Sequence, residues 1–254
     1  MARFLIMEYT KINAETIDKW IEEGWDWGIP ISHEAFLEAK KGNWEVGLTP
    51  TKAVPKEWFG DLKGKKILGL ASGGAQQMPV FAAAGAKCTV LDYSERQLLS
   101  EKEVSEREDY EIEIVHADMT KTLPFPDESF DIVFHPVSNC YVKDVDHVFR
   151  EAYRVLKKGG RLLSGLDNGL SYAFDDAQEK IVRRLPFDPL ANEADMRESL
   201  ETDSGVQFSH DVSEQIGGQL RAGFILKDIF GDTDAAGNFH DHNIECYFAT
   251  LALK

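Results

Sequence analysis

Residues 67–77 read ILGLASGGAQQ and combine three features in one short stretch. The first four residues, ILGL, predict a buried strand because they are almost entirely apolar. Small residues follow from Ala71 to Ala75, and the segment QQMPVFAAAGA after them predicts a helix. A strand, a small-residue turn and a helix N-terminus let the backbone approach a ligand and offer it free N–H groups. We therefore expect an anion or nucleotide site here.

From residue 65 onward, strand-like and helix-like segments alternate. The strand candidates are KKILGLA, AKCTVLD, YEIEIVHA, FDIVFHPV and GGRLLSGLD. One helix between them begins with a capping box at Ser94 and Gln97, and the charges of its SEKEVSERE run are expected to form a solvated face. A second helix carries its apolar residues on a single face, namely Val145, Val148, Phe149, Ala152 and Val155. This alternation predicts a doubly wound, mostly parallel α/β sheet of the Rossmann-like type.

Two later strand candidates, AGFILKDIFG and NIECYFATLAL, bring the expected sheet to seven strands. Only a loop separates them, which predicts an antiparallel hairpin at the edge of the sheet. A helix is expected near 211–222. Residues 170–210 lack strong strand signals and are expected to form an insertion in the domain spanning 61–254.

The first 60 residues have a different character, since all five tryptophans lie before residue 59. Asn13 is expected to cap a helix, and a second short helix is expected after Ser32. We expect residues 1–60 to form an aromatic, helical cap that packs on the sheet and closes over the site as a lid.

Composition narrows the classes of partner. The chain has 254 residues, 44 acids and 28 bases, and its net charge is −16. Nucleic acids and anionic membranes are captured by basic surfaces, so both are disfavoured as partners. The oligomeric state is not indicated.

Cysteine content and apolar runs predict the compartment. The three cysteines, Cys88, Cys140 and Cys246, are odd in number and far apart, which favours free thiols in a reducing cytoplasm. No apolar run approaches the roughly 20 residues of a membrane span. The opening MARFLIMEYT is too short and too weakly basic for a signal peptide. We expect a cytoplasmic protein.

Asp92 ends the second predicted strand and lies 19 residues after Gly73. An acid at this spacing is placed to accept hydrogen bonds from ribose hydroxyls, so the spacing indicates an adenosine-type ligand. NAD and S-adenosylmethionine both qualify. The run from Ala71 to Gln76 lacks the third glycine of a dinucleotide fingerprint, and no Tyr-x-x-x-Lys pair is placed by the site, so an NAD-dependent oxidoreductase is the weaker alternative.

Four segments together resemble the class I S-adenosylmethionine-dependent methyltransferases, within the type 11-like group that modifies small molecules. They are ILGLASGGA, TVLDYSERQL, VHADMTKTLPFPDESFDIVFHPVSNCYV and VFREAYRVLKKGGRLL. The resemblance runs from about residue 65 to 165 and, with the two late strands, covers most of the chain after residue 60. It implies methyl transfer from S-adenosylmethionine to a small-molecule acceptor, with S-adenosylhomocysteine as the product.

The resemblance also implies roles by position for the adenosine half of the ligand. Asp92 would hold the ribose hydroxyls, and Tyr93 would pack beside the adenine. Asp118 would accept from the adenine amino group, and Met119 would lie against the ring.

For the methionine half, the backbone of the first loop would approach the ligand, and the floor near the methyl group would be formed by residues 135–137. The loop residues concerned are Ala71, Ser72, Gly73 and Gly74. This loop departs from the family pattern, because Gly69 replaces the usual acid and alanines replace the first and last glycines. Gln76 or Gln77 would then supply replacement hydrogen bonds. The departure keeps open a non-catalytic module that binds an adenosyl ligand.

The acceptor side carries weaker signals. His135, at the end of the fourth strand, is a candidate base or lining residue, and Tyr141 is a second catalytic candidate. The loop sequence SNCY does not match the signature of nucleic-acid amine methylases, so an RNA methylase is disfavoured. The residues expected to line the acceptor pocket are Tyr9, Trp25, Trp27, Trp44 and Asn139.

His240 and His242 are separated by one residue and would share a face on a strand, as metal ligands do. We expect an exposed hairpin loop at this position instead, and no metal.

Overall fold

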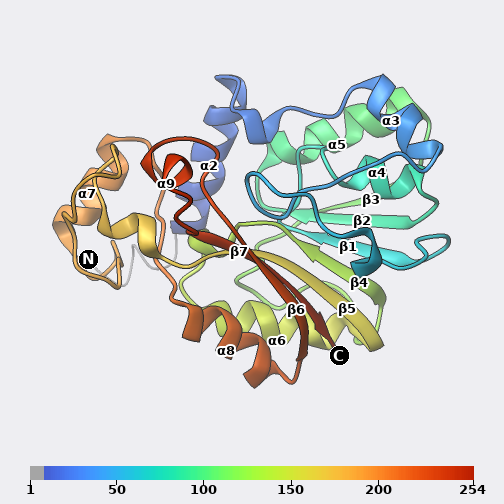
Figure 1. Cartoon of the computed structure of the whole chain (residues 1–254). Coiled ribbons are helices and arrows are strands. Elements are labelled where there is room, and N and C mark those ends of the chain that lie inside the picture. The colour runs from blue at the N-terminus through green and yellow to red at the C-terminus, as the bar shows by residue number, and fades with distance from the viewer. Residues whose placement is uncertain (1–8) are drawn as a thin grey trace.

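The computed structural model describes residues 9–254 (Figure 1). Most of the opening segment MARFLIMEYT lies outside the described residues, so the expectation that it is not a signal peptide stays a prediction. Within them, seven strands form one sheet in the order β3-β2-β1-β4-β5-β7-β6. The strands are β1 (Lys66–Leu70), β2 (Lys87–Asp92), β3 (Ile112–His116), β4 (Phe130–His135), β5 (Leu156–Asp167), β6 (Ile225–Asp232) and β7 (Tyr247–Leu253).

The first five strands are parallel, and β7 runs antiparallel to both of its neighbours, β5 and β6. The predicted fold class is therefore confirmed, including the antiparallel pair. The pair forms one edge of the sheet, with β7 joined to β5 and β6 as the outermost strand.

Helices cover both faces of the sheet (Figure 1). Helices α3, α4 and α5 lie on one face, and α6 and α8 on the other. The α-helices are α2 (Tyr9–Glu22), α3 (His33–Lys40), α4 (Met78–Ala83), α5 (Glu95–Glu108), α6 (Val145–Val155), α7 (Glu193–Glu201), α8 (Val212–Ala222) and α9 (Asn238–Asp241). The short 3₁₀ helices are η1 (Asp26–Gly28), η2 (Lys56–Trp58), η3 (Asn139–Tyr141) and η4 (Leu170–Ala173).

Each face of the sheet has its own apolar core. Phe59, Phe81 and Phe134 pack together on the α4 side, with ring centroids 5.1–6.1 Å apart. On the opposite side, the predicted apolar face of α6 is confirmed, since its five residues are all at most 4 % exposed. Burying two faces in this way fixes the strands, so that their carboxyl ends present rigid positions for a site.

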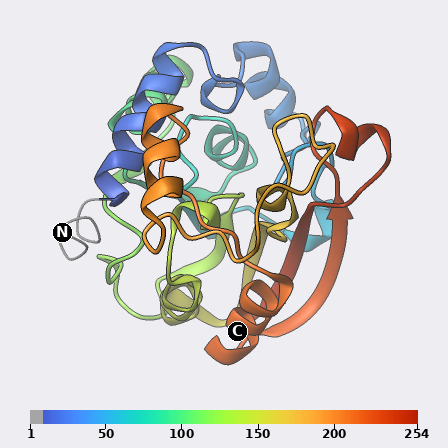
Figure 2. The same cartoon turned by 90° about the vertical axis from the view of Figure 1, so that its left-hand side faces the viewer.

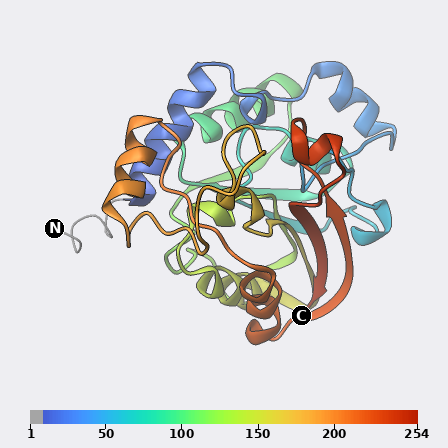
Figure 3. The same ribbon diagram turned by 60° about the vertical axis from the view of Figure 1, so that its left-hand side comes forward.

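The N-terminal segment covers the carboxyl ends of the strands together with the predicted insertion. Figures 2 and 3 show α2 and α7 side by side over this end of the sheet. The two are joined by a small apolar core that contains Tyr9, Met196, Val206 and Phe208. The insertion thus holds a helix, α7, that its sequence pattern did not predict.

Asn13 was predicted to cap α2. The helix begins at Tyr9 instead, so Asn13 lies inside it. The buried side-chain amide of Asn13 instead forms hydrogen bonds to the backbone of the insertion through both its nitrogen and its oxygen. Asn13 Nδ2 donates to the carbonyl of Val206 at 2.9 Å, and the Val206 N–H donates to Asn13 Oδ1 at 2.6 Å. Trp20 Nε1 adds a bond to the carbonyl of Asp203. These bonds tie cap and insertion into one layer.

No helix in the span from residue 9 to 254 is long and apolar enough to cross a membrane.

Candidate active site

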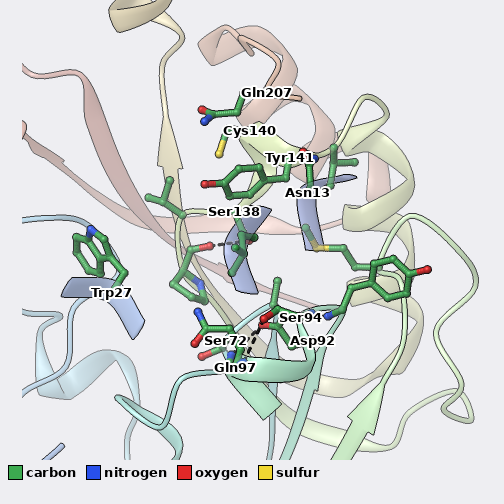
Figure 4. A pocket seen from close by; sticks show the side chains of 18 of the residues that line it. Asn13, Trp27, Ser72, Asp92, Ser94, Gln97, Ser138, Cys140, Tyr141 and Gln207 are labelled. Atoms are coloured by element: carbon green, nitrogen blue, oxygen red, sulfur yellow. Dashed lines mark hydrogen bonds between the residues drawn. The ribbon is translucent and has the colours of Figure 1, made fainter. Parts of the chain in front are cut away.

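A cavity of about 320 Å³ lies at the carboxyl ends of the parallel strands, beneath α2 and the insertion. This volume falls in the range of small-molecule sites. Figure 4 shows side chains from distant parts of the chain around it. Near one end lie Ser72, Asp92, Ser94 and Gln97; toward the other lie Cys140, Tyr141 and Gln207. The cavity is where a doubly wound sheet binds its ligand.

The loop after β1 has the conformation that glycines normally adopt. Ala71 and Ala75 have φ angles of 49° and 56°, in the left-handed region, at the two positions where the family pattern has glycine. A non-glycine residue in this region costs about 1–2 kcal/mol. The loop keeps its shape because neighbours hold its amides. Gly73 N donates to Asp92 Oδ2 at 3.0 Å, and Ala75 N donates to Glu101 Oε1 at 2.8 Å.

Gly69 faces the side chain of Met78 at the start of α4. A Cβ at Gly69 would lie 2.7 Å from Met78 Sδ and 3.2 Å from Ser72 Cβ. The thioether therefore occupies the space that a side chain at position 69 would need, and an acid there would require Met78 to shift.

Glu101 of α5 supports the loop from behind. Its side chain is fully buried, although the charges of this helix were predicted to be solvated. Burial raises the pKa of Glu101 to about 8, partly opposed by the Ala75 amide. Its second oxygen and the hydroxyl of Tyr110 are both buried without a hydrogen-bond partner among residues 9–254. A neutral carboxyl group at physiological pH therefore takes part in holding the loop.

Asp92 ends β2 and lines the cavity, as predicted. Its carboxylate accepts from the backbone N–H groups of Gly73, Tyr93 and Ser94 at 2.8–3.0 Å. Burial raises the pKa of Asp92, and the three amides oppose that shift. A carboxylate has about four acceptor positions, so these bonds leave room for a ligand hydroxyl.

The other predicted adenosine contacts also line the cavity. Tyr93 stacks on His116 with ring centroids 5.3 Å apart, and Asp118 accepts from the Thr120 N–H at 2.8 Å. Met119 lines the same region. The structure therefore brings these side chains together at the ends of β2 and β3.

His135 does not line the cavity, contrary to the prediction. It is 1 % exposed, and both ring nitrogens face buried partners: Nδ1 lies 2.9 Å from the Leu70 carbonyl, and Nε2 lies 2.8 Å from Asn139 Oδ1. Burial lowers the pKa of His135. Asn139 is also buried away from the cavity and donates to Gln215 Oε1. These groups join β1, η3 and α8, so neither His135 nor Asn139 is available to an acceptor.

Three further predicted residues lie outside the cavity lining. Tyr9 packs edge-on against Phe208, Trp44 packs against Phe59, and Gly74 N donates to the Gln97 carbonyl on the far side of the loop. The other predicted residues do line the cavity: Ala71, Ser72, Gly73, Gln76, Gln77, Trp25, Trp27 and Tyr141.

Gln76 and Gln77 have separate roles in the loop. Gln76 Nε2 donates to the carbonyls of Asp26 and Ile29 and so attaches the loop to the cap. Gln77 Oε1 accepts from Ser72 Oγ at 3.2 Å inside the cavity.

His240 and His242 lie exposed in the connection between β6 and β7, where an exposed loop was expected, although part of this connection forms the short helix α9. His240 is within α9 and His242 follows it, and each Nδ1 faces a backbone carbonyl.

Several lining residues were missed by the sequence analysis, among them Asp167, Tyr172, Asp234 and Tyr247. The signal for Asp167 was present, because it ends the apolar strand GGRLLSGLD just as Asp92 ends TVLD. The other three carry no comparable signal, since their positions depend on how the insertion and the β6–β7 connection fold back.

Comparison with known proteins agrees with this geometry. Residues 68–164 match a family model described as a methyltransferase domain. The uncharacterized methyltransferase YbaJ of Bacillus subtilis is 41 % identical over 249 residues, which cover 95 % of this chain and 97 % of that protein.

Solved structures share the fold at low identity. An S-adenosylmethionine-dependent methyltransferase from Mesorhizobium loti has a TM-score of 0.62 at 19 % identity, over 78 % of this chain and 95 % of that one. The 1,6-didemethyltoxoflavin-N1-methyltransferase of Burkholderia thailandensis has a TM-score of 0.60 at 12 % identity, over 98 % of this chain and 89 % of that one. Sheet order, cavity position and the full-length relative lead to one assignment: this chain belongs to the class I S-adenosylmethionine-dependent methyltransferase family.

Proposed function

We propose that this protein transfers the methyl group of S-adenosylmethionine to a small-molecule acceptor inside the cavity. The observation that carries the proposal is the Asp92 carboxylate, which ends β2, lines the cavity and holds the loop after β1 through Gly73. An acid in this place is suited to the two ribose hydroxyls. Tyr93, Asp118 and Met119 would then surround the adenine.

The methionine half would lie along Ala71, Ser72 and Gly73. Because position 69 is a glycine, another acceptor has to receive the ammonium. Gln77 Oε1 is suited to this, since it lies in the cavity and already accepts from Ser72. An amide oxygen supplies a weaker acceptor than a carboxylate, so we expect a lower affinity than a loop with the acid would give.

Transfer from a sulfonium is a direct displacement, so the main task of the protein is to position the acceptor and exclude water. The cap and the insertion, tied by Asn13 and Val206, enclose the cavity in a way that suits a small acceptor. The net charge of −16 argues against RNA. The related fold of Burkholderia thailandensis, described with 1,6-didemethyltoxoflavin and S-adenosylhomocysteine bound, supports a small acceptor. We propose a cytoplasmic location, because the three cysteines are buried and free.

The two alanines in left-handed conformation favour one rival, a module that binds an adenosyl ligand without turning it over. Methyl transfer to any acceptor would exclude this rival.

Calorimetric titration with S-adenosylhomocysteine tests the proposal. We expect micromolar binding by the wild type, no binding of NAD, and loss of at least about tenfold in affinity in Asp92→Ala. Asp176→Ala, at an exposed position that is not part of the cavity lining, is the matched control and should bind as the wild type does. Absence of S-adenosylhomocysteine binding by a folded wild-type protein would reject the proposal.

A further inference from the structure

The half of the cavity opposite Asp92 contains a carboxylate that the proposed function has not used. Asp167 is the last residue of β5 and pairs in register with Tyr247, the first residue of β7. It is 3 % exposed and lines the cavity. Its Oδ1 accepts from the Gly169 N–H at 2.9 Å, whereas Oδ2 is buried with no hydrogen-bond partner among residues 9–254. A buried carboxylate oxygen left without a partner costs stability, and such atoms often serve a ligand.

Asp167 differs in this from the other acids around the cavity. Asp92 is bonded to three amides, and both carboxylate oxygens of Asp234 have partners, the Ala235 N–H and Gln178 Nε2. Asp118 accepts from Thr120 and is partly exposed to water. Of the four lining aspartates, Asp167 alone has a buried oxygen without a partner in the described part of the chain.

The charge around the cavity limits the acceptor further. The described lining residues include these four aspartates and no lysine, arginine or histidine. An anionic acceptor, such as a carboxylate or a phosphate, would face these four aspartates with no basic side chain in the described lining to offset them. A neutral acceptor that donates hydrogen bonds suits this environment.

Three tyrosines surround the same end, namely Tyr141, Tyr172 and Tyr247. Tyr172 is fixed, because its hydroxyl donates to Gln207 Oε1 at 2.7 Å and its ring stacks on Phe187. Burial raises the pKa of all three phenols, so they remain protonated and cannot act as bases near neutral pH. They provide flat aromatic walls, which suit a flat acceptor.

The titratable groups near Asp167 are His210, Cys140, Tyr172 and Tyr247. Burial raises the pKa of Asp167 to about 6, and nearby His210 opposes the shift. The carboxyl group is therefore mainly ionised at neutral pH, yet basic enough to take a proton from a weakly basic nitrogen after that nitrogen has been methylated.

We propose that the acceptor is a flat aromatic compound with an N–H group, that Asp167 Oδ2 binds this N–H, and that Asp167 takes its proton once methylation has made the ring cationic. The step balances as a displacement. The lone pair of a ring nitrogen forms the new N–C bond, the C–S bond breaks with its electron pair going to sulfur, and the N–H proton, made acidic by the positive charge that methylation places on the ring, passes to Asp167. This inference rests on the proposed function, which supplies the methyl donor.

Calorimetry on the protein saturated with S-adenosylhomocysteine tests recognition with three probes: indole, 1-methylindole and benzoate. We expect indole to bind with a Kd of about millimolar order, 1-methylindole to bind about tenfold more weakly because it lacks the N–H, and benzoate not to bind. Indole affinity should fall by about three- to tenfold as the pH drops below 6, where Asp167 becomes protonated. Equal binding of the two indoles, or tighter binding of benzoate, would overturn the inference.

Two variants locate the effect. Asp167→Asn keeps the acceptor for Gly169 and should fold, but its indole affinity should be reduced and independent of pH. Asp234→Asn removes the same charge from the cavity wall and should cause a smaller loss, because both of its oxygens already have partners. Equal losses in the two variants would show that net charge, rather than the Asp167 carboxylate, governs binding.

A single-turnover assay tests the proton transfer, with benzimidazole as the N–H acceptor and mass spectrometry to detect the methylated product. We expect Asp167→Asn to slow the transfer by about 100-fold while leaving the affinity for S-adenosylhomocysteine unchanged. Loss of that affinity would mean instead that Asp167 binds the methionine ammonium, and an unchanged rate, or no transfer by the wild type, would reject the base role. If the wild type failed to bind S-adenosylhomocysteine at all, the proposed function itself would fall, which distinguishes the two failures.

Discussion

Met78 Sδ would lie 2.7 Å from a Cβ placed on Gly69, so the Met78 thioether occupies the space that a side chain at position 69 would need. The loss of the family acid and the presence of methionine at the start of α4 are therefore parts of one packing arrangement. Restoring the acid without overpacking this space therefore calls for a smaller side chain at position 78 as well.

Gly69→Asp is expected to lower the free energy of unfolding by about 1–3 kcal/mol, because it overpacks the space beside Met78. Urea unfolding measures this loss. Met78→Ala alone should also destabilise, by about 2–5 kcal/mol, since it leaves a cavity in a fully buried site. In the double variant the two losses should be clearly less than additive. Additive losses would show that the two positions do not compete for space.

Glu101→Gln is expected to remove a pH dependence of stability. Burial raises the pKa of Glu101 from its ordinary value of 4.5 to about 8, so between these values the folded protein holds a proton that the unfolded chain releases. The stability that this proton contributes is complete below the unfolded value and is lost as the pH rises through 8. Glutamine keeps an oxygen for the Ala75 amide and does not titrate.

Thermal unfolding across this pH range measures the effect. The Tm values of wild type and Glu101→Gln should agree near the lower end, at about pH 5, and diverge toward about pH 8, with the variant more stable. Asp92, Tyr110 and Cys88 surround Glu101 and are common to both proteins, so the difference between the two curves isolates Glu101. A constant difference at all pH values would contradict a neutral Glu101.

His135→Asn is expected to affect stability and not the chemistry. Losing a buried imidazole that bridges the Leu70 carbonyl and Asn139 should cost about 1–3 kcal/mol of unfolding free energy. The pH profile of methyl transfer should stay the same, because the ring does not reach the cavity. A profile that loses a group titrating near neutral pH in this variant would restore His135 as a base.

Asn13→Ala is expected to loosen the layer that covers the cavity. It removes both buried bonds to Val206, so backbone amides in 203–208 should exchange hydrogen faster, and the affinity for S-adenosylhomocysteine should fall by about three- to tenfold. Lys11→Ala, at an exposed site on the same helix, is the control. Exchange that stays unchanged in Asn13→Ala would mean that the apolar core around Phe208 holds the layer by itself.

The parts of the fold that local pattern determines were predictable. The parallel strands β1, β2, β4 and β5 contain buried apolar runs, and the edge strand β3 is partly exposed. The apolar face of α6 repeats at helical spacing, so these elements follow from sequence alone. Asp92 followed from its place at a strand end. Asp167 also ends an apolar strand, so its position at the cavity was predictable in the same way.

The rest depended on contacts between distant segments. The end of a strand does not reveal whether its last side chain faces the cavity or a neighbouring carbonyl, and His135 turned out to face Leu70. Nor does the local pattern show that Asn13 bonds to Val206, which is 193 residues away in the sequence. The pattern also placed Asn13 at the start of a helix in which it is an interior residue. The position of β7 inside the sheet is likewise decided by pairing with β5, whereas proximity in sequence suggested only a hairpin with β6.

The place of β7 between β5 and β6 has a consequence for the order of assembly. During synthesis β6 is completed before β7, and in the described sheet β6 pairs with β7 alone, so it has no partner strand until β7 has been made. In that interval β6 presents an unpaired backbone edge, and such edges favour aggregation. Tyr247 and Asp167 come together when β7 pairs with β5. The part of the cavity lined by these two residues is therefore completed after the part lined by Asp92.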